Sequence, residues 1–192
     1  MKRLSRPWLG LTRLAGLVIL TMALSSCVVL PEANVTTRLQ EMTESRTAVV
    51  ASRLVHYYDW GPPDAPIVLV CVHGWAGGGI DFYALAHSAP FLGVPVRLIA
   101  LDLPGAGFSG RPADSLGMDG YSEFLAQWFG HVRASLVTRP DAALVPVGHS
   151  MGGHILLRTF WRYRFGPAAA DQDPALRTSL AGFDRLILMA PD

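Results

Sequence analysis

Short runs of apolar residues, separated by turns rich in Gly and Pro, predict a sheet of buried β-strands. The run 67–72, Ile-Val-Leu-Val-Cys-Val, is continuously apolar and rich in β-branched residues, which is typical of a strand buried on both faces. The segment 53–60 alternates and contains several aromatic residues, so it predicts a strand as well. Further strands are expected at 96–101, 144–147 and 185–190.

Helices are expected between most of these strands. Residues 121–136 carry apolar side chains at every fourth position along one helix face, namely Phe124, Trp128, Val132 and Leu136. Two more helices are expected at 81–89 and 151–164, whereas 35–51 fits either a loose helix or a short first strand. The alternation of strand and helix predicts an α/β fold: a mostly parallel sheet with helices on both faces and a site at the carboxyl ends of the strands.

The composition is that of one globular domain. The chain has 192 residues, of which 51% are hydrophobic and 16% charged, and its formal net charge is +1. The basic excess lies within the first 27 residues, which contain no acid, so the remainder is slightly acidic. A slightly acidic body gives no reason to expect a nucleic-acid partner.

The first 27 residues are typical of an export signal. A basic segment up to Arg13 precedes the apolar stretch 14–24, which is short for a membrane span of roughly 20 residues. The stretch ends in Leu24-Ser25-Ser26-Cys27, which resembles the lipobox of bacterial lipoproteins. The resemblance implies cleavage before Cys27, a lipid on that cysteine, and a membrane-anchored location in the bacterial cell envelope, facing the periplasm or the exterior. A plain signal peptide with an incidental cysteine is the alternative.

The chain is therefore expected to divide into three segments. Residues 1–26 form the lipoprotein signal peptide, 27–52 a tether and N-terminal segment, and 53–192 the folded domain. If Cys27 carries lipid, Cys71 is the only other cysteine, so no internal disulfide is expected. Cys71 lies within an apolar run, where a cysteine is typically buried and inert.

The motif Gly148-His149-Ser150-Met151-Gly152 gives the first indication of catalytic chemistry. It follows an expected strand and precedes an expected helix, so the serine stands at the apex of a sharp turn. In such a nucleophile elbow the flanking glycines remove Cβ atoms that would clash in the strained turn. A serine exposed above the end of a sheet in this way predicts a serine hydrolase.

Two further motifs follow the preceding strands at the same edge of the sheet. His73-Gly74-Trp75 comes after the first of these strands, and Asp102-Leu103-Pro104-Gly105-Ala106-Gly107-Phe108-Ser109 comes after the second. Together with Gly148–Gly153, their order and spacing resemble the α/β-hydrolase superfamily, in its branch of esterases, lipases and proline-iminopeptidase-like enzymes. The resemblance covers about 54–190 and implies the α/β-hydrolase fold.

The resemblance also implies roles for the motif residues. Ser150 is expected to be the nucleophile. The backbone N–H groups of Trp75 and Met151 are expected to form an oxyanion hole, which stabilises the charged oxygen during acyl transfer. His73 and Asp102 are expected to support the loops that follow their strands, rather than to act as base or acid.

The expected reaction is hydrolysis of a carboxylic ester through an acyl-enzyme, with a small-molecule ester or acyl compound as substrate. A proline-iminopeptidase-like amide hydrolase of the same fold is the alternative. Neither needs a metal or an organic cofactor, and the sequence contains no cluster of metal ligands. The remaining motif residues are expected to shape the elbow and the oxyanion loop, with the His149 ring packed beside the strand: Gly74, Gly148, His149 and Gly152.

The sequence lacks the rest of a catalytic triad. In this fold the acid and then the histidine follow the serine along the chain. The only histidine after Ser150 is His154, and every later acid follows it. We therefore expect the chain to be the N-terminal part of a longer hydrolase, inactive by itself, with Asp192 as a weak candidate acid. A truncated or degenerate lipoprotein without catalysis is the alternative.

Overall fold

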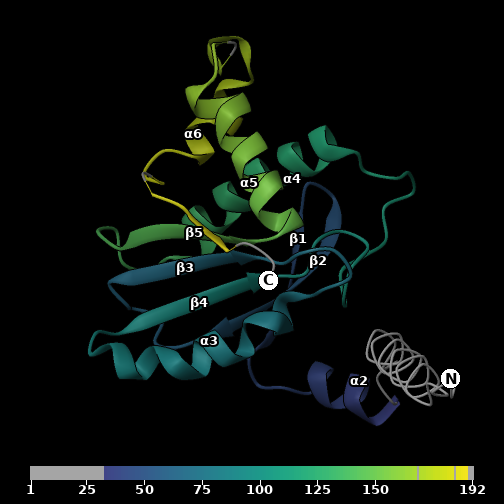
Figure 1. The fold of residues 1–192 in the computed structure, drawn as a ribbon, viewed down its shortest axis with the longest axis vertical. Coiled ribbons are helices and arrows are strands. Elements are labelled where there is room, and N and C mark those ends of the chain that lie inside the picture. Colours follow the sequence, from purple (N-terminus) through teal and green to yellow (C-terminus); the bar gives the residue numbers. More distant parts are fainter. Residues whose placement is uncertain (1–32, 168, 184, 190–192) are drawn as a thin grey trace, which may run out of the picture. The chain divides into compact units, whose positions relative to one another are not determined.

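The computed structural model describes residues 33–167, 169–183 and 185–189 (Figure 1). The chain divides into two compact units, Met1–Glu41 and Met42–Asp192. In the first unit, the described part contains helix α2 (Ala33–Gln40). The second unit contains the sheet and the three sequence motifs. No helix in the described ranges combines the length and the hydropathy that a membrane crossing requires.

In the described part of the second unit, six strands form one sheet in the order β1-β2-β4-β3-β5-β6. These strands are β1 (Ser45–Val50), β2 (Arg53–Trp60), β3 (Ile67–Val72), β4 (Val96–Leu101), β5 (Ala143–His149) and β6 (Ile187–Met189). β1 and β2 form an antiparallel hairpin, and β2 also pairs antiparallel with β4. The other four strands run parallel, so their carboxyl ends meet at one edge of the sheet.

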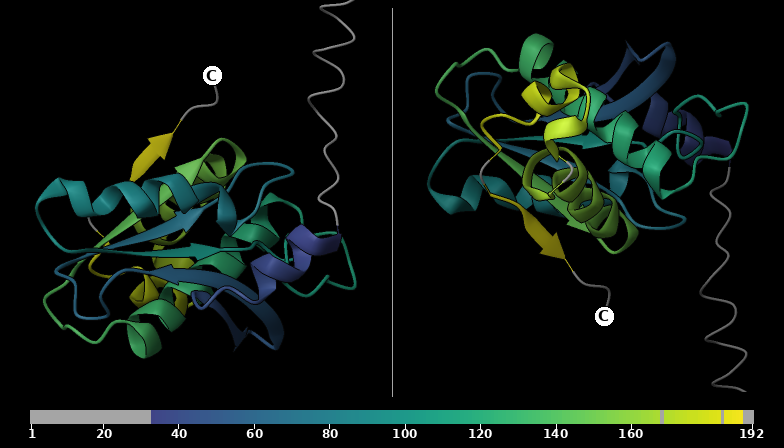
Figure 2. Two further views of the ribbon diagram at one scale, coloured as in Figure 1. Left: turned by 90° about the horizontal axis from the view of Figure 1, so that it is seen from below. Right: turned by 90° about the horizontal axis from the view of Figure 1, so that it is seen from above.

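Helices cover both faces of the sheet (Figure 2). One face carries α3 (Tyr83–Ser88), which is flanked by 3-10 turns at Gly79–Phe82 and Ala89–Leu92. The other face carries α4 and α5, with α6 packed against α4. Helix α4 spans Met118–His131 and continues into a π-helical turn at Val132–Leu136. Helix α5 spans Met151–Phe160 and continues into a π-helical turn at Trp161–Phe165. A 3-10 turn at Ala169–Asp171 and helix α6 (Pro174–Ser179) follow.

The side chains of β3 alternate between two cores. Val68, Val70 and Val72 lie in the core beneath α4 and α5, whereas Cys71 belongs to the core beneath α3. Each of these four side chains is at most 1% exposed, and burial of one aliphatic side chain contributes about 1.5–3 kcal/mol. The strand is apolar throughout because both of its faces meet a helical layer.

The predicted α/β architecture is confirmed, with a mostly parallel sheet between two helical layers. The segment 35–51 contains both of its predicted alternatives, since helix α2 is followed by strand β1. The sheet therefore already begins at Ser45, inside the segment 27–52 that we predicted to be a tether and N-terminal segment. Three predictions concern positions outside the described residues: the signal peptide 1–26, Cys27 and Asp192.

Two differences from the predicted helices have local causes. α4 begins at Met118, earlier than the predicted 121, directly after the extended Gly117. α6 was not predicted, because none of its residues is buried and it shows no apolar periodicity. Its start is set by the N-cap residue Asp173, whose carboxylate accepts from the Ala175 N–H (2.8 Å), and by Pro174 at the first helical position.

Candidate active site

Ser150 occupies the turn between β5 and α5 in a backbone conformation that is uncommon for serine. Its φ is 48° and its ψ is −119°, in the positive-φ region that favours glycine. Its N–H donates to the carbonyl of Met189 on β6 (2.9 Å), and its carbonyl accepts from the His154 N–H (3.2 Å). Such a conformation costs on the order of 1–3 kcal/mol and is found mostly at functional sites. The predicted strand–turn–helix context of this serine is therefore present.

The two flanking glycines allow β5, α5 and β3 to approach closely at this turn. A Cβ at Gly152 would lie 2.3 Å from the Val72 carbonyl oxygen, and one at Gly148 would lie 2.7 Å from the Cα of Gly153. Real Cβ atoms do not come so near to backbone atoms. Glycine is required at both positions because the main chain of a neighbouring element fills the space.

The loop after β3 passes directly over the elbow. A Cβ at Gly74 would lie 3.1 Å from the Cβ of Ser150 and 3.0 Å from Nδ1 of His149. The His149 ring is half-buried beside this loop. The absence of a side chain at Gly74 therefore lets the loop that carries Trp75 approach the serine.

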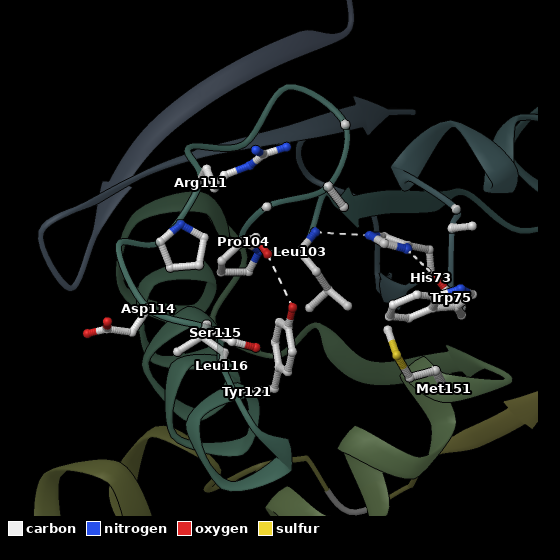
Figure 3. Close-up of a pocket in the computed structure, with 17 residues that line it drawn as sticks. His73, Trp75, Leu103, Pro104, Arg111, Asp114, Ser115, Leu116, Tyr121 and Met151 are labelled. Carbon is white, nitrogen blue, oxygen red and sulfur yellow. Dashed lines mark hydrogen bonds between the residues drawn. The ribbon is translucent and has the colours of Figure 1, made fainter. Parts of the chain in front are cut away.

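His73 orients this loop through both of its ring nitrogens (Figure 3). Nδ1 donates to the Gly74 carbonyl (2.7 Å), and Nε2 accepts from the Leu103 N–H (3.0 Å). The Gly74 carbonyl and the Trp75 N–H belong to one planar trans peptide unit, so they point in opposite directions. By holding that carbonyl, His73 directs the Trp75 N–H away from its own ring. A histidine with both nitrogens bonded to the backbone supports the loop and has no free nitrogen to act as a base.

A cleft of about 590 Å³ opens beside the elbow (Figure 3). Its walls are the loop 73–77, the loop after β4 and the approach to α4. Met151 lies at its floor and is half-buried, and Trp75 lines it with a side chain that is 84% exposed. Tyr121 donates its hydroxyl to the Pro104 carbonyl (3.3 Å) and braces the second wall. The structure thus brings Trp75 and Met151 to one cleft next to Ser150.

Asp102 holds the loop that follows β4, as expected. Its carboxylate accepts from the backbone N–H groups of Gly79 (2.6 Å) and Phe108 (2.9 Å). A third bond joins it to Nδ1 of His56 on β2 (2.8 Å). His56 was missed at the sequence level, because it belongs to no motif. The pairing of β2 with β4, which the sequence does not show, brings the two residues together: the Asp102 N–H donates to the His56 carbonyl (3.0 Å).

No histidine is placed to activate the serine. All six histidines of the chain lie within the described residues, and none has a hydrogen bond to the Ser150 hydroxyl. His154 is exposed on α5 and contacts Ser150 only through the backbone. Burial raises the pKa of the Cys71 thiol far above its ordinary value, so this second potential nucleophile is inert as expected.

Comparisons with known proteins identify similar families and sequences. The model of the "Alpha/beta hydrolase family" matches residues 69–192, which is more than half of the chain. The chain is 34% identical over 110 residues to the dihydrolipoyllysine-residue acetyltransferase component of the acetoin cleaving system of Pseudomonas putida, a match that covers 57% of this chain and 27% of that protein. It is also 34% identical over 97 residues to a serine hydrolase-like protein of Danio rerio, covering 50% of this chain and 27% of the relative. The chain spans about a quarter of each of these relatives.

Among solved structures, the thioesterase domain from the curacin biosynthetic pathway is similar in fold. It superimposes with a TM-score of 0.54 at 24% identity, over 77% of this chain and 46% of that domain. At this identity the likeness concerns the fold alone.

Proposed function

We infer, because this chain belongs to the alpha/beta hydrolase family, that Ser150 is the nucleophile of a serine hydrolase that acts on carboxylic esters. The observation that carries this inference is the positive φ of Ser150 at the β5–α5 turn, directly beneath the loop of Gly74. In such a reaction the serine hydroxyl attacks the ester carbonyl and the alcohol leaves. Water then releases the acid from the acyl-enzyme.

The backbone N–H groups of Trp75 and Met151 are the proposed oxyanion hole. The Met151 N–H belongs to the first residue of the ten-residue helix α5, where the helix dipole favours negative charge. The Trp75 N–H is directed by the bond between His73 and the Gly74 carbonyl. A donor of this kind stabilises the transition state by about 2.7–4 kcal/mol.

The cleft suits a substrate that carries both apolar and polar parts. Its lining is about equally apolar and polar, with Arg111 and Asp114 beside Leu116 and Met151. The serine hydrolase-like relative supports serine chemistry, and its name gives no bond type. We therefore keep the carboxylic ester as the proposed substrate class, to be tested against the matching amide.

Catalysis at full rate requires a base that the six histidines of this chain do not supply. A serine whose triad partners are absent retains only the contribution of the oxyanion hole and of binding. We therefore propose that Ser150 reacts slowly in this chain by itself.

The test is covalent labelling with a fluorophosphonate, followed by mass spectrometry of the labelled peptide. Label is expected on Ser150, at a low rate, and Ser150→Ala should abolish it. Ser115→Ala is the matched control, because Ser115 lines the same cleft and is exposed. Equal labelling of wild type and Ser150→Ala contradicts the assignment of the nucleophile.

We also propose that Cys27 carries a lipid anchor and holds the protein in the cell envelope. The proposal rests on the Leu24-Ser25-Ser26-Cys27 motif after an apolar stretch. Cys27→Ser should move the protein from the membrane fraction to the soluble fraction, whereas Cys71→Ala should not, because Cys71 is buried in β3. Unchanged membrane association of Cys27→Ser contradicts the proposal.

A further inference from the structure

Behind the cleft, three side chains form a hydrogen-bonded series that joins the edge hairpin to the loop after β4. Ser45 Oγ lies 2.8 Å from His56 Nε2, and His56 Nδ1 lies 2.8 Å from Asp102 Oδ2. Ser45 pairs with Tyr58 and Thr47 with His56, so Ser45 and His56 are diagonal neighbours on one face of the hairpin. His56 and Asp102 are each 2% exposed.

The Asp102 end of this series joins the two walls of the cleft. One carboxylate oxygen accepts from the Gly79 N–H, just after the loop 73–77, and the other accepts from the Phe108 N–H in the loop after β4. Both loops line the cleft. A displacement of this carboxylate would therefore move both walls together.

The surroundings leave the series little freedom. A Cβ at Gly107 would lie 2.0 Å from Asp102 Oδ2, so the loop is packed directly on the carboxylate. The His56 ring lies edge-on between the rings of Tyr58 and Phe108, at 4.8 and 5.0 Å between centroids. Ser109 adds a second connection, because its hydroxyl donates to the Asp102 carbonyl and accepts from the His56 N–H.

The order serine, histidine, aspartate is that of a catalytic triad, but this series ends on backbone N–H groups of the loops. Ser45 is not among the residues that line the cleft. Asp102 accepts at every contact, so the proton shared with His56 resides on Nδ1. On the other side of the ring, Nε2 is hydrogen-bonded to the Ser45 hydroxyl. Each group thus fixes the orientation of the next.

We propose that Ser45 and His56 are positioning residues of the active site. Through Asp102 they hold the two cleft walls, and thereby keep the Trp75 N–H directed at the oxyanion position. Their part in catalysis rests on the proposed function, whereas their hold on the loops does not depend on it.

The test is amide hydrogen exchange, measured on the full chain by mass spectrometry or NMR. In His56→Leu, the amides of Gly79 and Phe108 should exchange about tenfold faster, since one anchoring bond of their acceptor is lost, while the amides of β3 keep their rates. His56→Asn should restore most of the protection, because its amide nitrogen can donate to Asp102 from near the position of Nδ1. Ser45→Ala should give a smaller acceleration at the same two amides. Thr47→Ala, two residues along the same strand, is the control and should not accelerate exchange at either amide.

Unchanged exchange at Gly79 and Phe108 in His56→Leu overturns the proposal. Faster exchange throughout the domain that His56→Asn does not reverse also overturns it, because that result indicates a general loss of stability. If His56→Leu does not fold, Ser45→Ala decides: acceleration confined to the two loop amides supports the proposal, and no acceleration overturns it. The rate of fluorophosphonate labelling should follow the same order among the variants. A wild-type chain that never labels contradicts the proposed function and leaves the exchange test intact.

Discussion

The elbow and the cleft loops meet at one cleft, yet different forces hold them in place. At the elbow, main chain packs against main chain, and glycines at 148 and 152 leave room for it. The cleft loops are held by buried polar side chains. His73 and Asp102 bond to backbone groups 30 and 23 residues away in the sequence, and His56 bonds to the Asp102 carboxylate. The glycines that permit the first arrangement belong to one short continuous motif. The second depends on residues that come together only after the sheet has formed.

The largest effect is expected from filling the space at the elbow. Gly152→Ala places a Cβ 2.3 Å from the Val72 carbonyl oxygen, so α5 must move away from β3. We expect a loss of about 1–3 kcal/mol in the free energy of unfolding, as for other overpacked sites, together with loss of Ser150 labelling. Urea denaturation and the fluorophosphonate assay measure the two effects.

Gly153→Ala is the matched control on the same helix. A Cβ there meets its neighbours at 3.4 Å or more, which is ordinary contact. Alanine also favours the helix over glycine by about 1 kcal/mol, so this variant should be at least as stable as wild type. If both variants lose the same stability, close packing at the elbow is not what requires Gly152.

An effect of intermediate size is expected from a change in the loop 73–77. His73→Leu removes the bond to the Gly74 carbonyl and leaves the buried Leu103 N–H without its acceptor. The loss of stability should be about 1–3 kcal/mol. Ser150 labelling should fall by about 10²-fold if the Trp75 N–H is the oxyanion donor we propose, since the bond that orients it is lost.

The backbone of the elbow should respond differently to His73→Leu and to Gly152→Ala. In His73→Leu, the amide of Ser150 should keep its protection from exchange, because its bond to the Met189 carbonyl belongs to the sheet. Rapid exchange of that amide in His73→Leu would mean that the elbow and the loop are one structural unit, contrary to our comparison.

The smallest effect concerns a histidine outside both regions. Burial lowers the pKa of His131 below its ordinary 6.5, and its Nε2 is buried without a hydrogen-bond partner among the described residues. The unfolded chain therefore binds more protons than the folded chain between these two pKa values, and stability falls as the pH drops through about 6.5. His131→Gln should reduce the difference in urea stability between about pH 7.5 and pH 5.5. If the pH dependence of stability is unchanged in His131→Gln, groups other than His131 cause it.

The apolar pattern was sufficient to predict the parallel strands and the elbow, because both are encoded by adjacent residues. The run 67–72 is buried on both faces, and Ser150 stands where strand gives way to helix. β1 was left ambiguous because it is an edge strand whose first residues, Ser45 to Thr47, are polar and partly exposed. The role of His56 could not be predicted, since it depends on the pairing of β2 with β4 that brings Asp102 beside it.

The bond from the Ser150 N–H to the Met189 carbonyl also sets an order of events during protein synthesis. Ser150 leaves the ribosome well before β6 does, so its N–H has no partner in the sheet until that short, exposed strand has paired with β5. The Ser150 N–H therefore gains its hydrogen bond to the sheet late. A nascent chain halted before β6 would carry the elbow motif without this bond.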